Sequence, residues 1–265
     1  MIYKFFYYIL SLFPSLKRFF WKFWYTRFSS KIKNPNLRFM NYGYFKKDLI
    51  VDINDDINKY PTQLYHYLAS QSEIGGKNVL EIGSGRGGGA FYIARTFKPK
   101  KMIALDISPT AIDLCNKIYD LNNLEYCVGD AQKLNFNDNF FDVVINVESS
   151  HCYPNMDIFL NEVNRVLKPN GHFLFADLRR SYLLDSMFKK FDSANFKTVK
   201  KEDITQNILQ ASDLMSDQRK KMIAKNYPSI LHSIFESFAA VKGSKVYNSF
   251  SEGYLKYVLA VFKNR

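Results

Sequence analysis

The chain has 265 residues, of which 47% are hydrophobic and 23% are charged, and its formal net charge at pH 7 is +12. This composition can bury a large core, and with only 12 glycines and 8 prolines it excludes disordered, collagen-like and low-complexity proteins. Three cysteines without metal-type spacing make a disulfide scaffold or a zinc module implausible, so we expect no metal site and a cytoplasmic location.

Positive charge is concentrated in the first 50 residues, where ten Lys or Arg stand against one acid and supply +9 of the +12. Residues 2–13 are apolar, but twelve residues rise only about 18 Å as a helix, short of the roughly 30 Å core of a bilayer. Residues 15–28 carry Phe and Trp side chains at helical spacing, with Lys17, Arg18 and Lys22 off that stripe, which predicts a cationic amphipathic helix. Such a helix either contacts a membrane surface through residues 1–30 or closes as a lid over the protein's own pocket, and both uses stay open.

From Lys77 onward, short apolar runs alternate with helical patterns. The predicted strands are 78–82, 101–105, 124–128, 141–147 and 171–176, followed by two more at 196–201 and 254–262. The predicted helices between them are 87–97, 109–119 and 156–167. This alternation predicts right-handed crossovers and a parallel sheet covered on both faces, which is a doubly wound α/β fold. Residues 203–253 are too long for a plain connection and predict a helical cap inserted before the last strand.

A glycine-rich turn follows the first predicted strand, in the sequence VLEIGSGRGGGA from Val79 to Ala90. Five glycines let the backbone turn tightly and approach a ligand before the next helix begins. Gly83, Gly85 and Gly88 match the dinucleotide pattern G-x-G-x-x-G, with Asp106 a further strand along. The chain lacks G-K-[ST] after this loop, which excludes a P-loop.

Four carboxylates stand at or near the ends of the first four predicted strands: Glu81, Asp106, Asp130 and Glu148. Ligands bind at this edge of a doubly wound sheet, where a pyrophosphate would be repelled by so many acids. S-adenosylmethionine suits the edge better, because it carries an ammonium, a sulfonium and hydrogen-bond donors. Each acid taken singly could instead cap a helix or a turn, but four of them after one glycine loop favour a ligand site.

At this point the chain resembles the class I S-adenosylmethionine-dependent methyltransferases. The resemblance rests on VLEIGSGRGGG at 79–89, ALDISP at 104–109, GDAQKL at 129–134, FDVVINVESSHCYP at 141–154 and RVLKPNGHFLFAD at 165–177. Within that family it is most similar to the phthiotriolone and phenolphthiotriolone dimycocerosate O-methyltransferases and to fatty-acid and lipid methyltransferases. The resemblance implies a Rossmann-like sheet of seven strands, with residues 1–50 as arm or lid and 51–265 as the methyltransferase domain.

The resemblance also implies which residues surround the methionine part of the cofactor. Gly83, Ser84 and Gly85 would border it, with Glu81 close to its ammonium group. Asn146 would lie beside it at the end of the fourth strand.

On the nucleoside side, the resemblance implies that Asp106 binds the ribose hydroxyls and that Ile107 lies against the adenine. Asp130 would accept a hydrogen bond from the adenine amine, and Ala131 would offer its backbone. The residues that would close an N-terminal segment over the cofactor are Tyr42 and Tyr44.

Methyl transfer is an in-line displacement at an activated methyl group, so the protein has to align the acceptor and, for a hydroxyl, remove its proton. His151 is the best candidate base, because it follows the fourth strand and imidazole titrates near neutral pH. Glu148 is the second choice, and local packing of His151 is the alternative to a catalytic role. Cys152 stands beside His151, but adjacent residues rarely share one site in the geometry of a nucleophile pair.

These features predict an enzyme that transfers a methyl group from S-adenosylmethionine to an oxygen of a hydrophobic small molecule or lipid. Methylation of a sterol-like carbon is the nearest alternative. Two alternatives from other classes are a nucleic-acid methyltransferase, favoured by the basic arm, and a nicotinamide-dependent oxidoreductase with the same glycine loop. We expect no nucleic-acid partner, because charge is nearly balanced beyond the arm. The protein is then cytoplasmic, or peripheral at the membrane surface.

Overall fold

The computed structural model describes residues 37–53 and 57–265 of the chain. The apolar run at 2–13 and the predicted amphipathic helix at 15–28 lie outside the described residues. In the part that is described, no helix combines the length and the apolar character that crossing a membrane requires.

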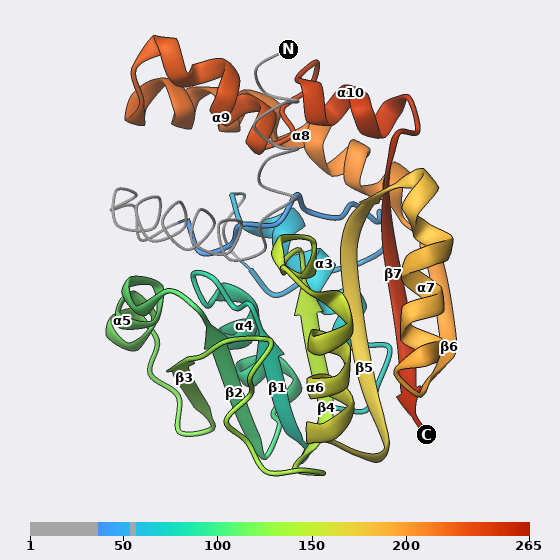
Figure 1. Cartoon of the computed structure of the whole chain (residues 1–265). Coiled ribbons are helices and arrows are strands. Elements are labelled where there is room, and N and C mark those ends of the chain that lie inside the picture. The colour runs from blue at the N-terminus through green and yellow to red at the C-terminus, as the bar shows by residue number, and fades with distance from the viewer. Residues whose placement is uncertain (1–36, 54–56) are drawn as a thin grey trace.

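A seven-stranded sheet with the order β3-β2-β1-β4-β5-β7-β6 forms the centre of the molecule (Figure 1). Its strands are β1 (Asn78–Ile82), β2 (Lys101–Asp106), β3 (Leu124–Val128), β4 (Phe141–Val147), β5 (Leu167–Arg180), β6 (Phe196–Asp203) and β7 (Leu255–Asn264). The order reverses at β1, which pairs with β2 on one side and with β4 on the other. This reversal is the point at which open α/β sheets bind ligands. The predicted doubly wound α/β fold is confirmed.

The last strand departs from the predicted parallel sheet. β7 runs antiparallel to both β5 and β6, so the sheet is mixed. β6 ends at the carboxyl edge of the sheet, and the connection that follows it returns the chain to the sheet at that same carboxyl edge. β7 therefore starts there and runs in the direction opposite to β6.

Helices cover both faces of the sheet. They are α3 (Lys59–Ala69), α4 (Gly88–Phe97), α5 (Pro109–Ile118), α6 (Met156–Val166), α7 (Leu184–Ser193), α8 (Thr205–Asn226), α9 (His232–Phe238) and α10 (Lys245–Ser251). One core cluster joins α3, α4 and α5 to one face, with Leu64 and Ile93 among its buried side chains. A second cluster joins α6 and α7 to the opposite face, where Phe191 of α7 stacks on Phe262 of β7 at a centroid distance of 4.0 Å.

The helices α8, α9 and α10 lie between β6 and β7 in the chain and beyond the carboxyl edge of the sheet in space (Figure 1). The segment 37–45 runs between these helices and the glycine loop. The backbone amide of Gly88 donates to the carbonyl of Arg38 at 3.2 Å, and the amide of Phe45 donates to the carbonyl of Asn207 in α8 at 3.1 Å. The segment is therefore tied to both sides of the space above the sheet.

Candidate active site

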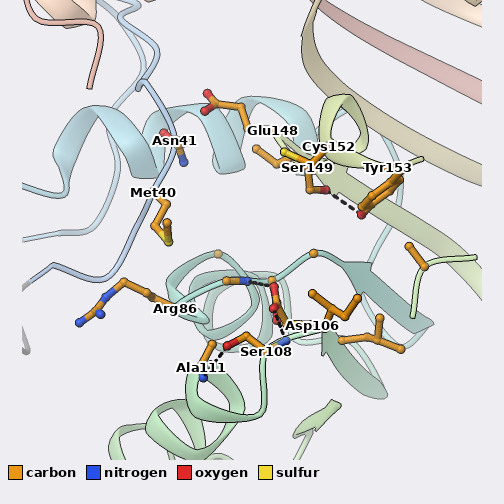
Figure 2. Close-up of a pocket in the computed structure, with 18 of the residues that line it drawn as sticks. Met40, Asn41, Arg86, Asp106, Ser108, Ala111, Glu148, Ser149, Cys152 and Tyr153 are labelled. Carbon is orange, nitrogen blue, oxygen red and sulfur yellow. Dashed lines mark hydrogen bonds between the residues drawn. The ribbon is translucent and has the colours of Figure 1, made fainter. Parts of the chain in front are cut away.

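A cavity opens at the carboxyl edge of the sheet, between the glycine loop, the ends of β2 and β4, and the segment 38–42 (Figure 2). Of the thirteen site residues predicted from the sequence, ten line it: Tyr42, Gly83, Ser84, Gly85, Asp106, Ile107, Asp130, Ala131, Glu148 and His151. The other three, Tyr44, Glu81 and Asn146, are buried outside its lining.

The glycine loop lines one wall of the cavity and is held in an unusual backbone conformation. Gly83 has φ +80°, and a Cβ atom on it would lie 2.5 Å from the Ser149 side chain. Its amide donates to the carbonyl of Leu105 at 2.8 Å, which ties the loop to the end of β2. Both the positive φ and the close approach of Ser149 require glycine at this position.

Asp106 connects the glycine loop to the start of α5. Its carboxylate accepts from the backbone amide of Gly85 at 2.8 Å and from that of Ser108 at 2.9 Å (Figure 2). Burial raises the pKa of Asp106, while these amide donors oppose the rise. The helix cap is a different residue, because the Ser108 side chain accepts from the amide of Ala111. The suggestion that Asp106 caps this helix is therefore wrong.

Asp130 lines the cavity and shapes the turn after β3. Its carboxylate accepts from the amide of Gln132 at 3.0 Å. Asp130, Ala131 and Gln132 all line the cavity, so this turn presents both side-chain and backbone polar groups to it.

Glu81 and Asn146 lie beneath the lining on opposite faces of the sheet. Glu81 is fully buried, accepts from the Tyr65 hydroxyl at 2.7 Å, and has a pKa that burial raises to about 7. Asn146 donates to the carbonyl of Ile82 at 2.9 Å and to the Ser149 hydroxyl at 2.7 Å. Around the loop, Glu81 Oε2, Asn146 Oδ1 and Ser84 Oγ are buried without a hydrogen-bond partner among the residues that the structure describes. Since buried polar atoms are usually paired, such atoms are typical of a site that receives a polar ligand.

The two tyrosines predicted to close over the cofactor have different surroundings. Tyr42 lines the cavity, and its backbone amide donates to Glu148 Oε1 at 2.8 Å. Tyr44 is buried and stacks on Tyr67 at a centroid distance of 4.8 Å, away from the cavity. Only Tyr42 is therefore placed to contact a ligand in this cavity.

Glu148 projects from the turn after β4 and has φ +44°, which is uncommon for a residue with a side chain. Burial raises its pKa to about 7, although the amide of Tyr42 and the neighbouring His151 favour the charged form. A carboxyl group that titrates near neutral pH can exchange a proton under physiological conditions.

His151 is held by a buried carboxylate that the sequence analysis did not identify. Its Nδ1 lies 2.8 Å from Asp177 Oδ1, and its backbone amide donates to Asp177 Oδ2 at 3.0 Å. Asp177 is fully buried at the end of β5 and also accepts from the Ser150 hydroxyl at 2.6 Å. Bonding of Nδ1 to the carboxylate leaves Nε2 as the basic atom of the neutral ring.

The charges around this pair shift both of its pKa values. Burial opposes a charged His151, yet the neighbouring Cys152 and Asp177 hold its pKa well above the ordinary value of 6.5. Burial alone would raise the pKa of Asp177, but Arg179 and His151 hold it well below the usual range. Each charged form of the pair therefore favours the charged form of the other.

The sequence contained a signal for Asp177 that was not used. Asp177 directly follows a buried apolar run, as Asp106 does. That position was the reason for selecting Asp106 as a site residue. Arg179 belongs to the same buried cluster. Its side chain is 13% exposed, and its guanidinium lies 3.1 Å from Asp177 Oδ2 and donates to the Ser150 hydroxyl at 2.7 Å.

Metal binding finds no support in residues 37–53 and 57–265, where no three His, Cys, Asp or Glu side chains gather into a group that could hold an ion. The three cysteines are free thiols.

Comparisons with known proteins agree with this geometry. A family model described as a methyltransferase domain matches residues 74–239. The chain is 34% identical over 245 residues to a phthiotriol/phenolphthiotriol dimycocerosates methyltransferase of Mycobacterium leprae, covering 91% of each. It is 35% identical over 236 residues to a fatty-acid O-methyltransferase of Mycolicibacterium smegmatis, covering 88% of this chain and 85% of that protein.

Solved structures share the fold at low sequence identity. A geranyl diphosphate C-methyltransferase from Streptomyces coelicolor superposes with a TM-score of 0.66 at 16% identity, covering 91% of this chain and 97% of that one. The [4+2]-cyclase SpnF gives the same TM-score at 16% identity, covering 90% and 94%. A methyltransferase and a cyclase are equally similar, so these two likenesses show the fold alone.

Proposed function

The chain belongs to the methyltransferase domain family, and from this premise we propose that it transfers a methyl group from S-adenosylmethionine to an oxygen of a hydrophobic small molecule or lipid. The observation that carries the proposal is a single cavity that joins the glycine loop and its carboxylates to the His151–Asp177 pair. The glycine loop and its carboxylates suit a cationic cofactor, and the His151–Asp177 pair suits removal of a proton from an acceptor.

The residues around the cavity fit S-adenosylmethionine. Asp106 and Asp130 offer acceptors to the ribose and adenine, and Glu148 places a further carboxyl group in the lining. Ser84 Oγ in the lining and Asn146 Oδ1 beneath it have no hydrogen-bond partner among the described residues, which supports a polar ligand such as the methionine part on this side of the cavity. When bound, the cofactor supplies an activated methyl group on its sulfonium. The chain's own work is to hold that ligand and to orient the acceptor oxygen toward it.

We assign His151 as the general base. Asp177 fixes the imidazole through Nδ1, so that Nε2 of the neutral ring can accept the proton of an acceptor hydroxyl. Ser150 and Arg179 hold Asp177 in turn, which keeps the ring in one orientation. Glu148 is the second candidate, but its Oε1 already accepts from the amide of Tyr42.

An apolar acceptor is supported by the lining and by the relatives. Phe39, Met40 and Phe238 are apolar residues that border the cavity. The two relatives are named for lipid or fatty-acid methylation, which favours an acceptor of that class. A peripheral membrane contact through residues 1–30 would give access to such an acceptor, because cationic and aromatic side chains together favour anionic lipid surfaces.

The test is incubation with methyl-labelled S-adenosylmethionine and a lipid extract, followed by identification of the labelled product by mass spectrometry. The expected product is an apolar compound that carries the label as a methyl ether or methyl ester. Label on carbon would support the sterol-like alternative, and label on added RNA or DNA would support the nucleic-acid alternative. Binding of a nicotinamide cofactor in place of S-adenosylmethionine would contradict the whole proposal.

A further inference from the structure

A second cavity lies beside the first and has no role in the proposed chemistry so far. It is bounded by the segment 37–42, by residues 57–61 at the start of α3, and by α8 together with Phe238 and Ala239. Five residues line both cavities: Phe39, Met40, Asn41, Tyr42 and Phe238. The two cavities therefore adjoin along these residues, their shared wall, and His151 and Glu148 line the first cavity only.

One face of the C-terminal half of α8 lines the second cavity. The contributing residues recur at helical spacing and are Met215, Gln218, Arg219, Met222, Lys225 and Asn226, with Lys221 on the flank. At 1.5 Å per residue, the stripe from Met215 to Lys225 is about 15 Å long. Methionine side chains fit irregular apolar ligands because they are flexible and polarizable. This face therefore suits an extended apolar chain.

The two cavities differ in charge. The first is lined by the carboxylates of Asp106, Asp130 and Glu148. The described residues that line the second include Arg219, Lys221 and Lys225 and no acid. Arg38 and Arg86 also line the first cavity, so the difference is that the described lining of the second holds cations without an acid, which favours an anion there.

The three cations that line the second cavity have different structural roles. Arg219 donates to the carbonyls of Tyr42 at 3.1 Å and of Ala239 at 2.7 Å, so it holds the shared wall. Lys221 and Lys225 are exposed and form no ion pair with any described residue. These two lysines are therefore the exposed cations of the lining that can bind an anion.

We propose that the second cavity is the chain-binding part of the acceptor site. It takes the apolar chain of a single-chain amphiphile whose nucleophilic oxygen lies at the shared wall. Its second polar group, a carboxylate or a phosphate remote from the reacting oxygen, binds Lys221 and Lys225. This assignment rests on the proposed methyltransferase function and adds a requirement for an acceptor that is charged at its far end.

Three probes of equal chain length test the requirement: 12-hydroxydodecanoate, 12-hydroxydodecyl phosphate and 1,12-dodecanediol. Binding is measured by calorimetry with S-adenosylhomocysteine present, so that no turnover is needed. We expect the anionic probes to bind about tenfold more tightly than the diol, because two exposed ion pairs together contribute a modest gain in affinity. The tighter of the two anions identifies the head group. Equal affinity of all three probes, or no binding, overturns the proposal.

Variants test whether the preference for anionic probes arises in the second cavity. Lys221→Gln/Lys225→Gln should abolish the preference for the anionic probes while leaving affinity for S-adenosylhomocysteine unchanged. The matched control is Lys189→Gln/Lys220→Gln, which removes the same charge from exposed positions outside the cavity and should keep the preference. Met222→Trp should weaken binding of 12-hydroxydodecanoate more than that of 6-hydroxyhexanoate, because the chain space is shortened. Loss of preference in the control pair as well would mean that only net charge matters, and would overturn the site.

The orientation of the acceptor is tested by the position of the label. With 12-hydroxydodecanoate and methyl-labelled cofactor, the proposal predicts a methyl ether at the hydroxyl end. A methyl ester would place the carboxylate at His151 and overturn the assignment of the lysines, while the methyltransferase function would stand. Absence of any label transfer to lipids, together with absence of cofactor binding, would instead refute the proposed function.

Discussion

Asp106 combines two duties, since it faces the cavity and also accepts from the amides of Gly85 and Ser108. Asp106→Ala should therefore lower the affinity for S-adenosylmethionine at least about tenfold, because charge-assisted hydrogen bonds contribute roughly 1.5 to 3 kcal/mol each. Calorimetric titration measures the loss. Asp113→Ala, an exposed acid on α5, is the control and should bind normally. Unchanged affinity in a folded Asp106→Ala protein would show that the carboxylate only shapes the loop.

The pKa of His151 gives a prediction for pH dependence. A general base acts in its neutral form, so turnover should rise with pH and level off above the His151 pKa, which lies well above 6.5. Asp177→Asn removes the carboxylate that stabilises the imidazolium. The rise in turnover should then shift to lower pH, with a lower plateau because the ring is less well oriented. A pH profile of kcat for both proteins checks this, and an unshifted profile would assign the proton transfer to another group.

At the scale of the elements, β1 carries a buried carboxyl group whose pKa makes stability depend on pH. The pKa of Glu81 is about 7 when folded and 4.5 in its ordinary state, so the folded protein binds more protons between these values. The free energy of unfolding should therefore fall as pH rises from 4.5 to 7, by on the order of 3 kcal/mol from this group.

Glu81→Gln is the matched variant, because the amide keeps the shape and can still accept from Tyr65. Urea unfolding at pH 5 and pH 8 should show a smaller pH dependence for the variant than for the wild type. An identical pH dependence in both proteins would mean that Glu81 stays ionised in the folded state.

Some elements could be predicted from the sequence because a local pattern specified them. The apolar runs of β1, β3 and β4 gave the observed boundaries, and the helices after β1, β2 and β4 began within one residue of their predicted starts. α7 was not predicted, although Leu184, Met187 and Phe191 follow helical spacing. β5 proved longer than predicted, because polar Asp177 and Arg179 are buried by pairing with each other rather than by apolar character.

The site residues also divide into those that a local sequence pattern specifies and those that depend on the tertiary structure. Strand ends and the glycine loop were recognisable, and ten of the predicted residues do line one cavity. Glu81 and Asn146 lie beneath the lining, because alternation along a strand turns their side chains into the two faces of the sheet. The link between His151 and Asp177 joins residues 26 positions apart and depends on the pairing of β4 with β5, which a local pattern does not specify.

For the molecule as a whole, two roles are proposed for residues 1–30 of the basic aromatic arm: an anchor at the membrane surface or a lid over the cavity. If residues 1–30 are an interfacial anchor, replacing Lys17, Arg18 and Lys22 by Gln should weaken binding to anionic vesicles by about 3 kcal/mol, or more than about a hundredfold. Activity on a detergent-dispersed acceptor should be spared. A lid predicts the reverse, with slight vesicle binding throughout and a loss of turnover in Trp24→Ala. Vesicle co-sedimentation and turnover on both variants separate the two roles, and no change in either quantity would refute both.

The assignment of oxygen methylation by base catalysis is tested most directly by His151→Ala, with turnover and cofactor affinity measured on the same protein. Turnover is followed as S-adenosylhomocysteine formed with the acceptor identified from labelled lipid. The predicted result is a loss of about 10² to 10⁴ in kcat, with the affinity for S-adenosylmethionine nearly unchanged, because a general base acts on the acceptor and not on the cofactor. Wild-type turnover in the variant would contradict this assignment.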